Sequence, residues 1–212
     1  MIGESKVGNA IPESRGLYGL IMCGGNSQRM GTDKSMLAYY GKPQSYYLYE
    51  MLRPFCEKVF ISCNEKQVAA IDAGYQILTD LPCYKGIGPM AGLLTAFSHY
   101  PKNDFIIIGC DYPFLTGTEL AGFISMCKKE KVAAFFNRKE NLYEPLLAFY
   151  PSDTGDMLKE MHASQQYSLQ YFLRMNDAAK YHPVDERSMI SVDTSEDHVN
   201  TISMINKPVV EI

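Results

Sequence analysis

The chain lacks any apolar run of the roughly 18 residues that a membrane-spanning helix needs. Its opening stretch, MIGESKVGNAIPESRG, also lacks the apolar centre of a signal peptide. A length of 212 residues suits one domain of ordinary size with a real core. We therefore expect no membrane partner, a polar and loosely ordered leader over residues 1–15, and one domain over residues 16–212.

An excess of positive charge is also absent, because the formal net charge is −4 at pH 7. Proteins whose main partner is nucleic acid or an anionic membrane usually carry a basic surface. The charge balance therefore argues against nucleic acid and membrane as partners. It leaves small anionic ligands open, since a single cleft can be basic on an acidic protein.

The six cysteines form no C-x-x-C pair, the spacing in which zinc ligands usually come. We expect reduced cysteines without a metal, in a cytoplasmic protein. No Ser-His-Asp set is visible. The histidines are scattered, and we expect each to be a surface or packing residue: His99, His162, His182 and His198.

The sequence does contain a regular alternation of short apolar runs and helical patterns. The expected strands are residues 17–23, 58–63, 75–80, 104–111, 132–137 and 144–150. The expected helices are residues 45–55 (broken by Pro54), 89–100, 116–130, 152–162 and 168–176. This alternation predicts an α/β fold: a single three-layer domain with a mostly parallel, Rossmann-like twisted sheet and helices on both faces.

Ligands of open parallel sheets bind beyond the carboxyl ends of the strands. The residues just after Cys23, Cys63, Ile77 and Ile108 are therefore the first candidates for a site. There the sequence has a glycine-rich loop that begins at Gly24, and the polar residues Asn64, Asp80 and Asp111.

The glycine-rich loop reads GGNSQRMGTDK from Gly24 to Lys34. Glycines let backbone N–H groups approach an anion, and Arg29 and Lys34 add a bidentate donor and a compact charge. This composition favours a polyphosphate ligand. The spacing fits neither the Walker A loop nor G-x-G-x-x-G. The alternative is an ordinary strand-to-helix turn with solvated charges.

Asp111 follows the most apolar of the expected strands, in GCDYPFL. One carboxylate together with substrate phosphates is a common way to hold Mg²⁺. The alternative is an aspartate that only forms a turn, and Asp80 in TDLP carries the same ambiguity. Beyond Asp80, Gly86 and Gly88 lead into a helix whose start near Pro89 could also face an anion.

Three motifs in this order, GGNSQRMGTDKSML…GKP, GPMAGL and CDYPFL, resemble those of the nucleotidyltransferases that make molybdenum cofactors. The chain is most similar to the molybdenum cofactor guanylyltransferase (MobA) family, over roughly residues 17–120. The resemblance implies a nucleotide-diphospho-sugar-transferase-like fold. It also implies that the phosphate of molybdopterin (the Mo-cofactor) attacks the α-phosphorus of GTP, which transfers GMP and releases pyrophosphate.

The resemblance also implies roles for the residues that match the family motifs. Arg29 and Lys34 would neutralise the triphosphate, and Asp111 would bind Mg²⁺, with Mn²⁺ as an alternative ion. These three are the candidate catalytic residues. The implied nucleotide-binding residues are Cys23, Gly24, Gly25, Gly31, Lys34, Asn64, Asp80, Gly88, Pro89 and Asp111.

Near the C-terminus the sequence departs from the family pattern. Many relatives carry N-x-N-T-P-E-D, whereas this chain reads SVDTSED, with Ser191, Asp193 and Ser195 where Asn, Asn and Pro would stand. An aspartate in place of an asparagine removes two donors and adds a negative charge on the expected acceptor side. Position 23 is also Cys where Ala is usual, which we expect to affect packing only.

Two other functions stay open at this point. One is a sister nucleotidyltransferase, such as a molybdopterin cytidylyltransferase or a sugar- or alcohol-phosphate enzyme. The other is a non-catalytic nucleotide-binding protein that assists molybdoenzyme assembly. Retention of both Lys34 and Asp111 argues against the non-catalytic alternative. The partners that the resemblance implies are GTP, molybdopterin, and proteins that insert molybdopterin or receive it, the molybdoenzymes.

Overall fold

The computed structural model describes residues 15–23, 36–128 and 131–205. In this part of the chain one sheet has seven strands in the order β3-β2-β1-β4-β6-β5-β7. The strands are β1 (Leu17–Met22), β2 (Lys58–Cys63), β3 (Ile77–Thr79), β4 (Asp104–Gly109), β5 (Ala133–Asn137), β6 (Leu142–Tyr150) and β7 (Ala179–Tyr181). All neighbours pair in parallel except β6, which is antiparallel to β4 and β5.

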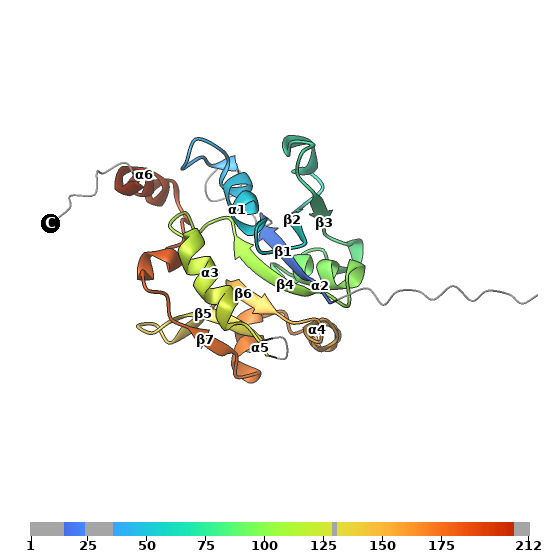
Figure 1. The fold of residues 1–212 in the computed structure, drawn as a ribbon. Coiled ribbons are helices and arrows are strands. Elements are labelled where there is room, and N and C mark those ends of the chain that lie inside the picture. The colour runs from blue at the N-terminus through green and yellow to red at the C-terminus, as the bar shows by residue number, and fades with distance from the viewer. Residues whose placement is uncertain (1–14, 24–35, 129–130, 206–212) are drawn as a thin grey trace, which may run out of the picture.

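Helices cover both faces of the sheet, so the domain has the three layers that the sequence predicts (Figure 1). One core cluster packs α1 (Gln44–Leu52) and α3 (Gly117–Met126) on one face. The other packs α2 (Met90–His99), α4 (Thr154–Ala163) and α5 (Leu169–Met175) on the opposite face. Strand β4 is buried along its whole length, because it is paired on both sides and covered on both faces.

Gly92 explains why the GPMAGL motif needs a glycine inside a helix. A Cβ at position 92 would lie 2.5 Å from Oγ of Ser62 and 2.7 Å from Cε of Met22. Helix α2 therefore lies close against β1 and β2, and this contact places the start of α2 near the carboxyl ends of those strands.

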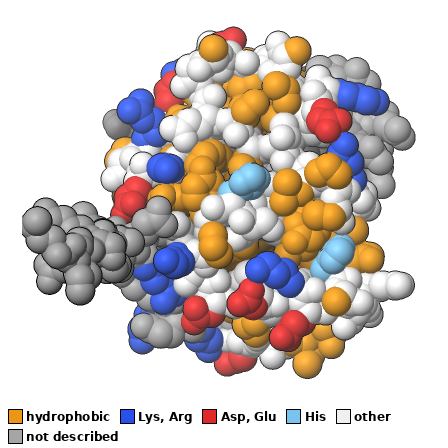
Figure 2. Space-filling model, turned by 90° about the vertical axis from the view of Figure 1, so that its right-hand side faces the viewer, with side chains coloured by type: hydrophobic (Ala, Val, Ile, Leu, Met, Phe, Trp, Pro, Cys, Tyr) orange, Lys and Arg blue, Asp and Glu red, His pale blue; other side chains and the backbone are white. Residues whose placement is uncertain are grey.

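Hydrophobic side chains also reach the surface on the side of the molecule that carries β3 and α2. The half-buried Tyr84, Ile87, Tyr100 and Met161 pack against the rim of the α2–α4–α5 core cluster. Figure 2 shows hydrophobic side chains gathered on this side, among scattered charges of both signs. Tyr84 meets the ring of His162 edge-on at 5.2 Å, so this histidine is a packing residue, as expected.

The structure differs from the sequence-based expectations mostly at element ends. Helix α1 ends at Leu52, two residues before Pro54, and Pro89 caps α2 rather than starting it. Helix α3 ends at Met126, so Lys128 lies beyond its last turn. Thr116 caps α3 by accepting from the Glu119 N–H at 3.2 Å.

Two elements escaped the sequence analysis: the edge strand β7 and helix α6 (Ser195–Ile205). Helix α6 begins with a capping box, since Thr194 Oγ1 accepts from the Asp197 N–H and Asp197 Oδ2 accepts from the Thr194 N–H. Three 3₁₀ segments complete the described part: η3 (Val68–Ala70), η4 (Pro82–Tyr84) and η5 (Glu186–Met189).

The predicted leader falls outside the described residues except for Arg15. The Arg15 Nε donates to Oδ1 of the buried Asp104 at 2.8 Å, at the amino end of β4. In the described ranges, no helix combines the length and the apolar character required to cross a bilayer.

Candidate active site

The sheet has a topological switch point between β1 and β4. After β1 the chain builds β2 and β3 on one side, and then returns to add β4 on the other side. Open α/β sheets bind ligands at the carboxyl edge of such a point. Backbone bonds extend the ladder past the strand ends, from Cys23 N to Ser62 O at 2.9 Å and from Cys110 N to Met22 O at 3.1 Å. Cys23 and Asp111 are thereby held at this edge.

The segment that follows Cys23 carries several predicted site residues. Gly24, Gly25, Arg29, Gly31 and Lys34 all lie outside the described residues. Their roles therefore stay predictions. Cys23 itself is buried at the end of β1, as expected for a small packing residue.

Gln67 connects the ends of β1 and β2. Its Nε2 donates to the Cys23 carbonyl at 3.2 Å, and its Oε1 accepts from the Asn64 N–H at 3.0 Å. The Asn64 Oδ1 in turn accepts from the Lys66 N–H at 3.0 Å. Gln67 thus fixes the position of Asn64. The sequence analysis did not identify Gln67, because this residue lies in a turn with no recognisable motif.

Asn64 and Asp80 share one pocket at the carboxyl ends of β2 and β3. The pocket has a volume of about 360 Å³ and is lined by Asn64, Glu65, Lys66, Asp80, Lys85 and Gly86. Lys85 forms an ion pair with Glu65 at 3.0 Å across it. Burial raises the pKa of Asp80, and the charge of Lys85 opposes that shift. Lys66 and Lys85 offset the negative charges of Glu65 and Asp80, which lowers the repulsion that an anionic ligand would meet in this pocket.

The turn between this pocket and α2 depends on two glycines with positive φ, Gly86 at 85° and Gly88 at 68°. Thr95 Oγ1 of α2 accepts from the Leu81 N–H at 3.0 Å and anchors the turn at its other end. Gly86 lines the pocket, whereas Gly88 and Pro89 lie at the start of α2 and do not line it. Lys85 and Gly86 are additional residues of the candidate site that the predicted nucleotide-binding set did not include. The pattern KGIGP over residues 85–89 could have indicated them.

Asp111 lies on the other side of β1 and does not line that pocket. Its Oδ1 packs against Gly109, so closely that a Cβ at position 109 would overlap it. Beside it, Tyr112 Oη donates to Glu144 Oε2 at 2.9 Å. Burial, followed by the charge of Asp111, raises the pKa of Tyr112, and the charges of Glu144 and Asp193 contribute in the same direction. This side of the site is therefore acidic.

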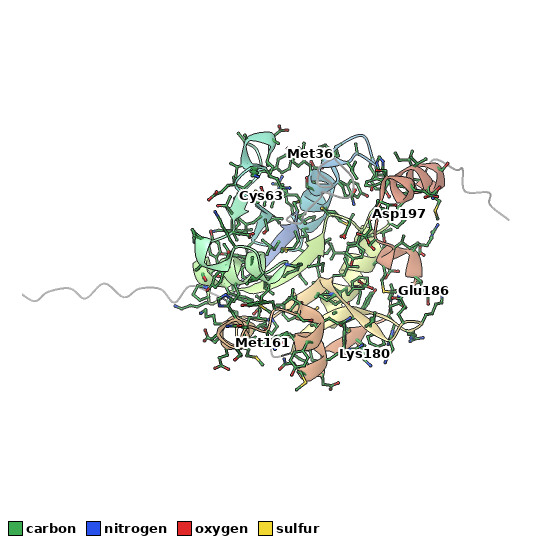
Figure 3. The ribbon with its side chains drawn as sticks, turned by 180° about the vertical axis from the view of Figure 1, so that it is seen from behind. Met36, Cys63, Met161, Lys180, Glu186 and Asp197 are labelled. Atoms are coloured by element: carbon green, nitrogen blue, oxygen red, sulfur yellow. The ribbon has the colours of Figure 1, made fainter. Side chains whose placement is uncertain are left out.

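Helix α6 reaches the same place through Tyr39. The Tyr39 ring meets the His198 ring edge-on at 5.1 Å. Burial raises the pKa of Tyr39, with further contributions from Cys110, Asp111 and Asp197. Tyr39 therefore lies between the end of β4 and α6. Asp197, in the first turn of α6, is labelled in Figure 3. No motif in the sequence indicated this contact.

The donor set around Asp111 is compatible with Mg²⁺. Among the residues with described coordinates, no group of three or more His, Cys, Asp or Glu side chains could hold a metal ion. Mg²⁺ is usually held by one or two carboxylates plus substrate phosphates, and it keeps several waters. A single carboxylate at the mouth of the sheet therefore fits an ion that arrives with a nucleotide.

The chain matches the family model described as "MobA-like NTP transferase domain" over residues 19–182. The molybdenum cofactor guanylyltransferase of Serratia proteamaculans is 31% identical over 166 residues, which cover 77% of this chain and 82% of that protein. The molybdenum cofactor biosynthesis bifunctional protein of Synechocystis is 29% identical over 200 residues, which cover 92% of this chain. This chain spans only 56% of that longer protein.

Solved structures share the fold. The molybdopterin-guanine dinucleotide biosynthesis protein A of Archaeoglobus fulgidus superposes with a TM-score of 0.70 at 20% identity, over 88% of this chain and 97% of that one. The 4-diphosphocytidyl-2C-methyl-D-erythritol synthase of Anaerococcus prevotii has a TM-score of 0.67 at 10% identity, over 91% of this chain and 99% of that one. With the sheet order, the edge pocket and the family match together, the chain belongs to the MobA-like NTP transferase family.

Proposed function

We propose that this nucleotidyltransferase transfers GMP from GTP to the phosphate of molybdopterin, releases pyrophosphate and forms the guanine dinucleotide cofactor. The observation that carries the proposal is the pocket that Asn64 and Asp80 share at the switch-point edge, next to Cys23. The glycine-rich segment with Arg29 and Lys34 begins directly after Cys23. Relatives named molybdenum cofactor guanylyltransferase support the choice of donor and acceptor.

Phosphoryl transfer needs in-line positioning and neutralisation of charge rather than covalent catalysis. The proposed donor side is the pocket of Asn64 and Asp80, where Lys66 and Lys85 neutralise part of the triphosphate charge. Arg29 and Lys34 are proposed to stabilise the charge that develops on the leaving pyrophosphate. Asp111 is proposed to hold Mg²⁺, which would neutralise negative charge on the phosphates and so favour attack on the reacting phosphorus.

The acceptor is proposed to approach from the side of Asp111 that carries Tyr112, Glu144 and Asp193. This side lies across β1 from the donor pocket, so the two anionic substrates would approach Asp111 from different sides. Gln67 and the turn over residues 81–89 would orient the nucleoside, because they fix Asn64 and Asp80 at the ends of their strands.

The test is release of pyrophosphate when the protein is incubated with GTP, Mg²⁺ and molybdopterin, compared with CTP and ATP. We expect release with GTP that depends on both Mg²⁺ and molybdopterin. Release with CTP at an equal rate would favour a cytidylyltransferase. GTP binding without release under any of these conditions would favour a non-catalytic assembly partner.

A further inference from the structure

The carboxyl edge of the sheet has an acidic middle, and cationic side chains lie toward both of its ends. Asp111, Glu144 and Asp193 raise the pKa of the same tyrosine and so form the middle. Lys66 and Lys85 lie at the β2–β3 end, in the proposed donor pocket. The far end carries Arg138, which follows β5, and Lys180, which lies within β7. Since the sheet runs β4-β6-β5-β7 and β6 alone is antiparallel, the carboxyl ends of β4, β5 and β7 share one edge.

Arg138 and His182 form an ordered pair at that far end. The Arg138 Nε donates to the His182 Nδ1 at 3.0 Å, which requires a neutral imidazole whose proton is on Nε2. Burial, together with the charges of Arg138 and Lys180, lowers the pKa of His182 and keeps the ring neutral. A hydrogen bond to the Phe136 backbone opposes this shift and occupies the other side of the ring, so His182 positions Arg138, whose terminal guanidinium nitrogens remain available as donors.

Lys180 is held next to this pair by an aromatic surface. Its Nζ lies 4.0 Å from the centroid of the Phe136 ring and 5.8 Å from that of Tyr143. The His182 ring meets Phe136 edge-on at 5.9 Å, on the same face of the sheet. Lys180, labelled in Figure 3, therefore lies over the same ring that His182 contacts.

The neighbouring carboxylates do not neutralise these cations. In the part of the chain that is described, Glu186 pairs with Lys139 at 2.6 Å, and Asp177 pairs with Lys131 at 3.2 Å. Neither Arg138 nor Lys180 forms a carboxylate ion pair within those ranges. A guanidinium and an ammonium that lie close together and lack a counter-ion favour an anion as ligand.

The cluster is connected to the Asp111 side through β6. Tyr112 reaches Glu144, which pairs with Phe135 of β5 on the face that α1 and α3 cover. The neighbouring pair, Phe136 with Tyr143, belongs to the core cluster of the opposite face. Arg138 follows Asn137 at the end of β5. A ligand that extends from Asp111 to the Arg138 cluster would therefore follow the edge of the sheet past β6, which lies between β4 and β5.

We propose that Arg138, Lys180 and His182 form an anion subsite for the acceptor, which binds an anionic group other than the reacting phosphate. The identity of the acceptor rests on the proposed function. Molybdopterin carries two anionic groups, its phosphate and its dithiolene sulfurs. The carboxylates of Asp111, Glu144 and Asp193 repel both anionic groups unless a metal ion lies between them. Cations further along the edge would supply the electrostatic attraction for the acceptor that these carboxylates do not.

The test compares Arg138→Ala and Lys180→Met with the wild type. Methionine keeps the aliphatic stem over Phe136 and removes the charge. The matched control is Lys102→Met, an exposed lysine between α2 and β4 at the opposite edge of the sheet. We expect a rise of about tenfold in the KM for molybdopterin for each subsite variant, because hydrogen bonds to charged groups are this strong. The Kd for GTP should not change in either subsite variant. Lys102→Met should keep the wild-type KM for molybdopterin.

A second measurement does not depend on turnover. The ¹⁵N shifts of the His182 ring are followed by NMR during titration with inorganic phosphate, in the wild type and in Arg138→Ala. We expect a saturable shift in the wild type that is lost in the variant. The absence of a shift in the wild type, or an unchanged KM in both subsite variants, would overturn the proposal. If the wild type shows the saturable shift but releases no pyrophosphate, the proposed reaction is rejected and the anion site is retained.

Binding of molybdopterin whose two sulfurs are alkylated shows which anionic group of the acceptor the subsite binds. If the sulfurs are bound, Arg138→Ala should weaken binding of intact molybdopterin and leave the alkylated form unaffected. Equal weakening for both forms would support the subsite and assign it to another anionic group of the acceptor.

Discussion

The backbone N–H of Val192 donates to the carbonyl of Asp111 at 2.9 Å. Val192 is buried, with 1% of its surface exposed, so this contact anchors the segment that carries Ser191 and Asp193. The part of the chain that departs from the family pattern therefore lies directly against the candidate metal ligand. This contact places Asp193 beside Tyr112 and on the expected acceptor side.

Replacing Asp111 with Asn should preserve the fold and lower turnover. The two side chains have nearly the same shape, while the substitution removes the charge that would hold Mg²⁺. Losing such a charge in the transition state commonly costs about 10²–10³ in rate. Pyrophosphate release and the melting temperature measure the two effects. Near-normal release would reject the metal assignment.

Gly109→Ala should disturb the same carboxylate indirectly. The new Cβ would overlap the Asp111 Oδ1 and lie 3.1 Å from Cε2 of Tyr112, so the Asp111 side chain must shift. We expect a fall in turnover that is larger than the fall in GTP affinity. The control is Gly117→Ala, where a Cβ would have no neighbour within 4 Å. Equal turnover of the two variants would show that the position of Asp111 is not critical.

Asp193→Asn should bind molybdopterin more tightly and leave the affinity for GTP unchanged. Asparagine removes a negative charge near Tyr112 and restores two donors, and it can still accept the hydrogen bond from Ser191 Oγ. Calorimetric titrations with each substrate separate the two affinities. Equal affinity of both proteins for molybdopterin would reduce Asp193 to a structural residue next to the α6 cap.

Alkylation of the cysteines should be selective. Burial raises the pKa of Cys56 and Cys127 to about 12, and the thiolate fraction falls tenfold for each pH unit below the pKa. At pH 8 only about one molecule in 10⁴ therefore has a thiolate at either position. Cys83, by contrast, is exposed beside the pocket turn. Mass spectrometry should find Cys83 modified first. The rate at which Cys56 and Cys127 are modified should increase as the pH rises.

A Cys83→Ser variant supplies the control for that experiment, because the fast modification should disappear from it. Urea should expose all six cysteines to the reagent. Rapid modification of Cys56 or Cys127 in the native protein would contradict the burial that the structure gives them.

Several parts of the fold and the site could be predicted from local sequence alone. The continuous apolar run Phe105–Ile108 predicts a strand covered on both faces, and β4 is such a strand. The expected strand over residues 58–63 coincides with β2. Alternation of strands and helices predicts the three layers. Because ligands bind beyond the carboxyl ends of parallel strands, Asn64, Asp80 and Asp111 could be chosen before any coordinates were known.

Tertiary structure alone decided which of these residues lie together. Asn64 and Asp80 share a pocket because β2 and β3 are neighbours, whereas Asp111 lies across β1, and this strand order is not readable from element lengths. Strand β7 and helix α6 have weak local patterns and depend on long-range partners, such as Val132 for Ala179 and Asp111 for Val192. Local propensity acts over a few residues. The contacts that complete the acceptor side join residues about 80 positions apart in the chain, so only packing of the whole domain brings them together.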